Sequence, residues 1–341
     1  MKKFYVTTTL LLFIFFLFFI GCNTENITEK NHLEKRNLYG KVKSIRSIEY
    51  VADENMGEIT KGEINPSGTH NSYFLYNTEG NINELIWYNP DGGISEKTTF
   101  EFDDKGNEIE KIIYRSDGSL MEKSLYEYDT NGNKIDESRY YSYNDSTFKR
   151  KYSYNDKGIQ IGEYLYDSNG ELEYKYTFIY DDRGNKIEEN EYNSDDSFKS
   201  NFIYKYDDNG NRIERIFYNT QGSSGIKETY KYDNNGNLNE NTLYNLDGSL
   251  RSKNSWKYND KGNKIEKNSY NKDNSINLKI TYKYDDKGNE TESNYHHLGS
   301  GSIRKSNSLY EYDENDNWIK RIYYMDEIPK FIVERTIKYY Q

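Results

Sequence analysis

Few side chains in this 341-residue sequence are placed to carry out chemistry. The four histidines are His32, His70, His296 and His297, and only the last two are adjacent. A zinc site needs about three or four convergent ligands, so two neighbouring imidazoles fall short. We interpret His296 and His297 as tolerated substitutions, and the sequence predicts neither a metal site nor a bound cofactor.

Acidic turns offer a second candidate chemistry. Segments such as Asp207-Asp208-Asn209-Gly210 carry oxygen atoms that a calcium ion could use. Calcium, however, takes about six to eight oxygens from a longer loop, and a tight turn by itself favours Asp and Gly at these places. No pair among the 57 acidic residues stands out as a pair of glycosidase carboxylates. The sequence therefore predicts turns here and a protein that is not an enzyme.

The only cysteine lies in the segment that best indicates the cellular location of the protein. Cys22 ends the segment MKKFYVTTTLLLFIFFLFFIGC, in which two lysines precede an apolar run from Leu10 to Ile20 and then Gly21. A positive region, an apolar region and a small residue in this order are typical of a secretion signal. A single cysteine also excludes an internal disulfide and a cysteine-cluster metal site.

The same segment resembles a bacterial lipoprotein signal through Phe19-Ile20-Gly21-Cys22, although phenylalanine stands where leucine is usual. The resemblance implies cleavage before Cys22 and lipid on its thiol. An uncleaved anchor is disfavoured because the apolar run from Val6 to Ile20 has 15 residues, whereas a span needs about 20. We therefore expect a signal peptide at residues 1–21 and a lipidated cysteine with a flexible tether at 22–37. This predicts export to the cell envelope, at the outer membrane or cell surface rather than the cytoplasmic membrane.

Composition limits the partners of the chain. The formal net charge is -11, and binding to phosphate backbones needs a basic footprint. We therefore expect no nucleic-acid partner, and membrane contact only through the lipid. Mean hydropathy is low at -1.10, yet aromatic residues make up 16% of the chain, including 37 tyrosines. Tyrosine rings can form a core while their hydroxyls reach water or a partner.

A repeat with a period of 26 residues fills the rest of the sequence. Nine copies carry a glycine in a setting like Tyr-Asp-x-x-Gly-Asn, and a period of this length indicates a repeat architecture. A tenth copy at Asp316 is displaced by two residues, which the segment Gly-Ser-Gly-Ser at 299–302 explains. The nine turn glycines are Gly80, Gly106, Gly132, Gly158, Gly184, Gly210, Gly236, Gly262 and Gly288.

Each copy contains two turns and two strands. Asp103-Asp104-Lys105-Gly106 has Asp at the first and Gly at the fourth position, the signature of a type I turn with a left-handed glycine. Arg115-Ser116-Asp117-Gly118 repeats this shape twelve residues later. Between turns, residues of one parity are apolar, as in Leu172-Glu-Tyr-Lys-Tyr-Thr-Phe-Ile-Tyr180. This alternation predicts strands with one buried face, which carries the aromatics six and four residues before each glycine.

The second strand of each copy leaves an alternative open. An isoleucine lies three residues after most turn glycines and a tyrosine eight residues after, as with Ile135 and Tyr140 after Gly132. These positions have opposite parity. Either both faces of the strand carry apolar side chains, or a β-bulge re-aims one set.

These patterns predict an all-β fold, a continuous antiparallel meander of about ten hairpin repeats with almost no helix after the signal. Residues 38–71 form an N-terminal β cap and residues 72–341 the repeat domain, with 330–340 as a capping strand. A flat sheet of this width is unusual. We therefore expect it to twist or curl into a spiral or open shell.

Stretches such as YKYDDNGN at 204–211 and YKYDDKGN at 282–289 resemble the YD repeats, also called RHS repeats, of bacterial surface and toxin proteins. In that family the repeats form a spiral shell around a C-terminal toxic domain. The likeness covers residues 72 to 324, but the period here is longer than the family's and the apolar residue after the turn comes one position later. It implies a curled β-sheet and not a toxin. Short Tyr/Gly hairpin arrays of the MORN type are the second resemblance.

Two functions fit these features. The first is a non-enzymatic lipoprotein whose repeats bind or scaffold another protein, because repeat arrays offer extended surfaces. The second is a carbohydrate-binding lipoprotein that uses exposed aromatic rings. Trp87, Trp256 and Trp318 depart from the local pattern and are the candidate stacking residues.

Overall fold

The computed structural model describes residues 31–66, 68, 70–219 and 225–341, and in these ranges it has one short helix and a single sheet of 23 strands. The elements are α1 His32–Lys35, β1 Val42–Asn55, β2 Glu58–Ile64, β3 Ser72–Tyr76, β4 Ile82–Tyr88, β5 Ile94–Phe102, β6 Glu108–Arg115, β7 Leu120–Tyr128, β8 Lys134–Tyr141, β9 Ser146–Tyr154, β10 Gln160–Tyr166, β11 Leu172–Tyr180, β12 Lys186–Asn193, β13 Phe198–Tyr206, β14 Arg212–Asn219, β15 Gly225–Tyr232, β16 Leu238–Asn245, β17 Leu250–Tyr258, β18 Lys264–Tyr270, β19 Ile276–Tyr284, β20 Glu290–His297, β21 Ser302–Tyr312, β22 Trp318–Met325 and β23 Ile328–Tyr339. The predicted all-β antiparallel meander is therefore confirmed.

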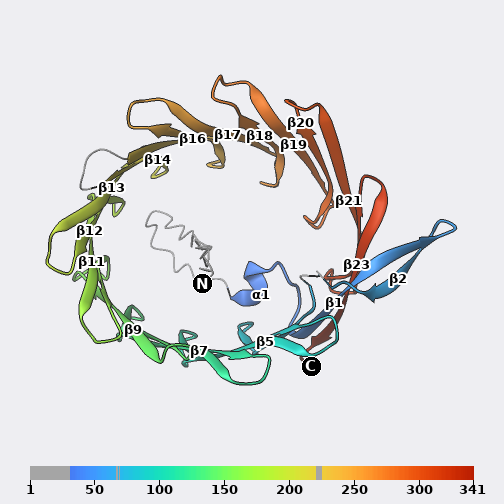
Figure 1. The fold of residues 1–341 in the computed structure, drawn as a ribbon, viewed down its shortest axis with the longest axis horizontal. Coiled ribbons are helices and arrows are strands. Elements are labelled where there is room, and N and C mark those ends of the chain that lie inside the picture. Colours follow the sequence, from blue (N-terminus) through green and yellow to red (C-terminus); the bar gives the residue numbers. More distant parts are fainter. Residues whose placement is uncertain (1–30, 67, 69, 220–224) are drawn as a thin grey trace, which may run out of the picture.

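The meander closes into a ring. From β3 to β23 each strand pairs with the next in the chain, and β1 pairs with β23 on one side and with β3 on the other. Ile45 on β1 lies opposite Ile337 and also opposite Phe74. The result is a barrel of 22 strands. In Figure 1 the blue strand β1 and the dark red strand β23 lie side by side. The hairpin of β1 and β2 projects outward from it.

Closure corrects the expectation of a spiral or open shell. The predicted N-terminal cap contains β1 and the predicted C-terminal capping strand is β23, and the two pair from Val42 opposite Tyr339 to Val51 opposite Phe331. Without this pairing, the first and the last strand of the meander would each be an edge strand with a row of unpaired backbone groups. Their mutual pairing removes both open edges of the ring.

The repeated turns have the predicted chemistry. All nine turn glycines have φ between 74° and 87°, the left-handed region that glycine adopts without strain. In the turn at 103–106 the amide of Gly106 donates to the carbonyl of Asp103 over 3.0 Å. The Asp103 carboxylate accepts from the backbone of Lys105 and from the backbone and side chain of Asn107. The Asp and Asn of the repeat motif therefore cap the turn.

A bulge settles the parity of the second strand. Tyr128 pairs with Lys134 and Glu127 with Asp136, so Ile135 is an extra residue without an opposite partner. One inserted residue shifts the facing of everything after it. Ile135 is therefore exposed on the same outer face as Tyr140, and the same register shift recurs in most copies.

The two faces of the ring differ. Arg36, just after α1, lies over the ring of Phe74 at 3.9 Å, and α1 lies inside the ring in Figure 1. The aromatics six and four residues before each turn glycine therefore face inward. The positions between them face outward, such as Lys231, which is 70% exposed.

The apolar core sits where the ring closes. Leu33 of α1 packs with Val42, Ile45, Phe74, Tyr76 and Ile82, all buried. Residues 31–37 were expected to belong to a flexible tether, but Asn31 caps α1 and the amide of Leu33 donates to the carbonyl of Gly80. This part of the predicted tether is packed against the ring. We call the region of α1, β1, β3 and β23 the seam.

Candidate functional site

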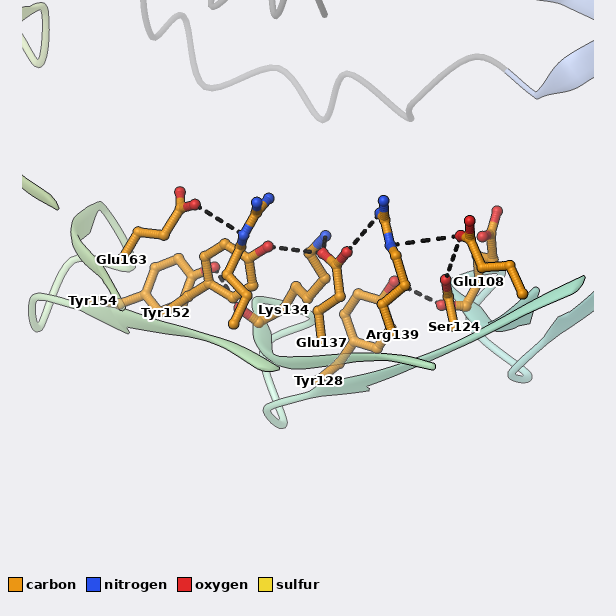
Figure 2. Close-up of polar contacts among 11 residues, drawn as sticks. Glu108, Ser124, Tyr128, Lys134, Glu137, Arg139, Tyr152, Tyr154 and Glu163 are labelled. Carbon is orange, nitrogen blue, oxygen red and sulfur yellow. Dashed lines mark hydrogen bonds and ion pairs between the residues drawn. The ribbon is translucent and has the colours of Figure 1, made fainter. Parts of the chain in front are cut away.

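The inner face of the ring carries a chain of ionic contacts, which we call the inner wall. Figure 2 shows it over β6 to β10, with side chains projecting from one face of the sheet. Several of these side chains, among them Glu137, Arg139 and Ser124, stand five or seven residues after a turn glycine or eight before one, positions where the residue type differs between copies. The residues drawn there include Glu108, Ser124, Lys134, Glu137, Arg139, Tyr152 and Glu163.

Glu137 is the centre of this network. Its side chain is 6% exposed and accepts from Arg139 at 2.9 Å, from Lys134 at 3.2 Å and from the Tyr152 hydroxyl at 2.9 Å. Burial would raise the pKa of this carboxyl, but the charge of Lys134 and the hydroxyl of Tyr152 outweigh burial and lower it. Glu137 is thus held ionised and fully paired.

The chain extends in both directions from Glu137. Arg139 Nε lies 3.5 Å from Glu122 on β7, and Arg150 on β9 pairs with Glu163 on β10 at 3.1 Å. Burial raises the pKa of Glu163 in spite of Arg150, and burial also raises the pKa of Glu108. The inner wall therefore contains carboxylates whose burial is outweighed by their partners, such as Glu137, and carboxylates whose burial is not, such as Glu163 and Glu108.

The same pattern continues on the next strands. Glu191 accepts from Lys199 at 2.7 Å and from Tyr176 at 3.1 Å. Arg215 pairs with Glu228 at 3.1 Å. The inner wall therefore presents both signs of charge among tyrosine rings along a large part of the circumference.

A row of tyrosines on the inner face, which we call the tyrosine ladder, forms hydrogen bonds to backbone carbonyls of the sheet. Tyr128 donates its hydroxyl to the carbonyl of Glu108 over 2.8 Å, because backbone pairing between β6 and β7 begins only at Glu110 opposite Leu125. Each of these tyrosines lies four residues before a turn glycine and satisfies a carbonyl of the preceding copy. The equivalent donors are Tyr154, Tyr180, Tyr206, Tyr232, Tyr258 and Tyr284.

The three predicted stacking residues all lie on the inner face, and each ring has a partner. Arg335 covers Trp318 with its guanidinium carbon 3.2 Å from the ring centroid. The ammonium of Lys264 lies 5.4 Å from the Trp256 ring, and Trp87 meets Phe74 edge to face. The structure therefore separates Trp256 from the other two, which flank the seam.

The remaining predicted residues are placed apart from the wall. The nine turn glycines lie along one rim of the ring, and Cys22 lies outside the described residues. His296 pairs with Lys279 on the outer face, whereas His70 contacts Glu49 on the inner face. In the described ranges, no group of three or more His, Cys, Asp or Glu side chains is arranged to hold a metal ion.

Sequence reasoning missed the inner-wall charges. It followed the residues that repeat, and Glu137, Arg139 and Glu163 occupy positions that vary from copy to copy. The inward parity of these variable positions was the available signal, but the bulge concealed it. No helix in the described part of the chain has both the length and the apolar character to cross a membrane.

Comparison with known proteins gives distant structural similarities. No protein-family model matches the chain, and no curated protein matches it. The structure is similar to that of TcdB2-TccC3 without its hypervariable C-terminal region, with 12% identity, a TM-score of 0.42 and coverage of 81% of this chain and 16% of that one. It is also similar to a porin-like protein from Bacteroides uniformis ATCC 8492, with 10% identity, a TM-score of 0.28 and coverage of 87% and 96%. The chain thus spans less than a fifth of the TcdB2-TccC3 chain.

Proposed function

We propose that this protein is a non-enzymatic lipoprotein of the bacterial envelope whose ring is a binding shell for another protein. One observation carries the proposal. The inner face of the sheet bears tyrosines, arginines and carboxylates along most of the ring, and the described segments that pack on it, α1 with the residues just after it and the loop with Asn65 and His70, lie at the seam.

The chemistry of the inner wall favours a protein as its occupant. Tyrosine and arginine are the residues that contribute most to protein interfaces. Paired charges of both signs, such as Arg139 with Glu137 and Arg215 with Glu228, suit a polypeptide that itself carries both signs. The Tyr-Asp-x-x-Gly-Asn turns support the further proposal that the repeats are YD-like.

The outer face supports a ring that stands in water beside the membrane. Glu214 lies between Lys205 and Lys227, with ion pairs of 2.7 and 2.6 Å. The same Lys-Glu-Lys row recurs at Glu240, Glu266 and Glu292. A membrane-spanning barrel has an apolar outer band, and charges at its middle destabilise it. In our proposal the lipid on Cys22, and not the ring, holds the protein at the membrane.

Site-specific photocrosslinking tests where the partner binds. A photoreactive phenylalanine analogue replaces Phe148, which pairs with Arg139 on the inner face, or Phe198, which is 41% exposed on the outer face. In cells, we expect a protein adduct from position 148 and none from position 198. Adducts at position 198 alone would place the partner outside the ring and contradict the proposal.

Affinity capture distinguishes the carbohydrate alternative. The full chain is immobilised and exposed to envelope extract with and without prior protease treatment. We expect the captured species to disappear after proteolysis. Capture that survives proteolysis, without an adduct at Phe148, would contradict a protein partner and favour a glycan.

A further inference from the structure

Three arginines lie inside the ring at the seam and on the neighbouring strand β22, close enough for their charges to influence one another. Arg36 follows α1, Arg321 is on β22 and Arg335 is on β23. Each guanidinium lies against an aromatic face: Arg36 over Phe74 at 3.9 Å, Arg335 over Trp318 at 3.2 Å and Arg321 over Tyr323 at 5.3 Å. Stacking fixes the plane of a guanidinium and leaves the N–H groups at its edge free to bind.

These arginines lack the carboxylate partners that three arginines of the inner wall have. Arg139, Arg150 and Arg215 each pair with a glutamate. Within the described ranges, by contrast, no carboxylate forms an ion pair with Arg36, Arg321 or Arg335. Arg321 Nε donates to the Ser308 hydroxyl at 3.1 Å, and Arg335 Nε is buried without a hydrogen-bond partner.

The buried acid of this region is already engaged. Glu49 on β1 is 3% exposed, and its carboxylate accepts from the Asn65 side chain and contacts His70. The arginine cluster therefore faces the inside of the ring as a positive site in a chain whose overall charge is negative.

A buried phenol points to the same ligand chemistry. Tyr76 is fully buried, with 0% of its surface exposed, and its hydroxyl has no partner within the described ranges. Arg36 and Arg335 are close enough to influence the pKa of Tyr76, which burial raises. The hydroxyl of Tyr76 is therefore a further hydrogen-bond donor, beside two guanidinium groups, for a ligand that accepts hydrogen bonds.

The buried charge of Arg335 has a cost for the fold. Burial, with a further contribution from the charge of Arg36, lowers the pKa of Arg335 to about 9. A buried charge without a partner destabilises a fold. A negatively charged group between the arginines would remove that penalty.

We propose that Arg36, Arg321 and Arg335, with the hydroxyl of Tyr76, form a binding site for an oxyanion. A carboxylate, a sulfate and a phosphate share the chemistry that bidentate guanidinium donors recognise. A carboxylate would come from a partner protein, and a sulfate or phosphate from a modified glycan or a small ligand. The site does not depend on the proposed protein partner, and anion binding is measured without one.

Thermal unfolding of the full chain in detergent tests the site. Sodium phosphate, sulfate or acetate is titrated against sodium chloride at equal ionic strength. We expect at least one oxyanion to raise Tm saturably and chloride not to. A stronger effect of phosphate or sulfate than of acetate identifies a tetrahedral anion as the ligand, and the reverse order identifies a carboxylate.

Variants show whether the effect arises at this cluster. Arg335→Gln is expected to weaken oxyanion binding about ten- to hundred-fold, the usual loss for a charged hydrogen bond. Tyr76→Phe keeps the ring and is expected to weaken it about ten-fold. Arg183→Gln, in an exposed turn away from the seam, is the control and leaves the affinity unchanged.

Two results would overturn the proposal. One is a Tm that does not respond saturably to any oxyanion in the unmodified chain. The other is an equal response in the unmodified chain and in Arg335→Gln, which would mean a general effect of salt. If Arg335→Gln does not fold, Tyr76→Phe and Arg335→Lys carry the test, because both keep the shape or charge of the site. Unchanged affinity in both would also overturn the proposal.

Discussion

The seam and the strands β5 to β20, which we call the repeat wall, are stabilised by different interactions. At the seam, Val42, Ile45 and Val333 are at most 2% exposed, and Leu33 of α1 packs in one cluster with Val42 and Ile45. In the described residues of β5 to β20, only Tyr204, Tyr230 and Ile280 are buried members of the core. The wall depends instead on strand pairing, capped turns, the tyrosine ladder and ion pairs. The comparison teaches that the repeats stabilise their neighbours locally, whereas closure depends on one apolar cluster.

The largest effect is expected from truncating the seam. Ile45→Ala removes a side chain that is 2% exposed and should lower the free energy of unfolding by about 2–5 kcal/mol, the range for buried isoleucine. The control Ile179→Ala, at a wall position that is 46% exposed, should change it by less than about 1 kcal/mol. Urea unfolding followed by circular dichroism measures both. Equal losses at the two sites would remove the distinction between seam and wall.

The second effect concerns the pH dependence of the wall. The pKa of Glu137 is lowered in the folded protein, so its contribution to stability is present above the ordinary value of 4.5 and is lost as pH falls through the folded pKa. Glu137→Gln should therefore lower stability at pH 7 by about 1–3 kcal/mol, with a loss that shrinks in acid.

Glu108 provides the opposite sign. Burial raises its pKa in the folded protein, so its ionised form opposes folding once pH exceeds that value, and protonation relieves the penalty as pH falls. Glu108→Gln should be neutral or stabilising at pH 7, and its advantage should vanish in acid. Thermal melts of both variants between pH 3 and pH 8, the range over which carboxyls titrate, provide the measurement. A destabilised Glu108→Gln at pH 7 would show that its carboxylate is compensated after all.

The smallest effect is expected from the tyrosine ladder. Tyr206→Phe removes one hydrogen bond of 2.8 Å, from its hydroxyl to the carbonyl of Lys186, and should cost about 1 kcal/mol. Tyr140→Phe is the control. The Tyr140 hydroxyl contacts Asp145 on the exposed outer face, so its loss should leave the stability unchanged. The midpoint of urea unfolding reports both. A Tyr206→Phe variant as stable as the parent would mean that water replaces the ladder.

Much of the wall could be predicted from the sequence because its signals are local. The glycine of a type I turn, the Asp that caps it and the alternation around Tyr204 and Tyr206 all act within one hairpin. The position of Ile135 was less accessible, because one bulge residue reverses which face the rest of the strand presents. The same reversal hid Glu137 and Arg139 of the candidate site.

The sequence by itself determined the strands, the turns, the repeat length and the inward tyrosines, since each depends on residues near one another in the chain. Only the tertiary structure decided that the meander closes, because Ile45 and Ile337 meet across almost the whole sequence and no local pattern specifies how far the accumulated twist will bend a sheet. It also decided that Arg36, Arg321 and Arg335 gather at the seam. Those arginines come from opposite ends of the chain, and closure alone brings their charges together inside the ring.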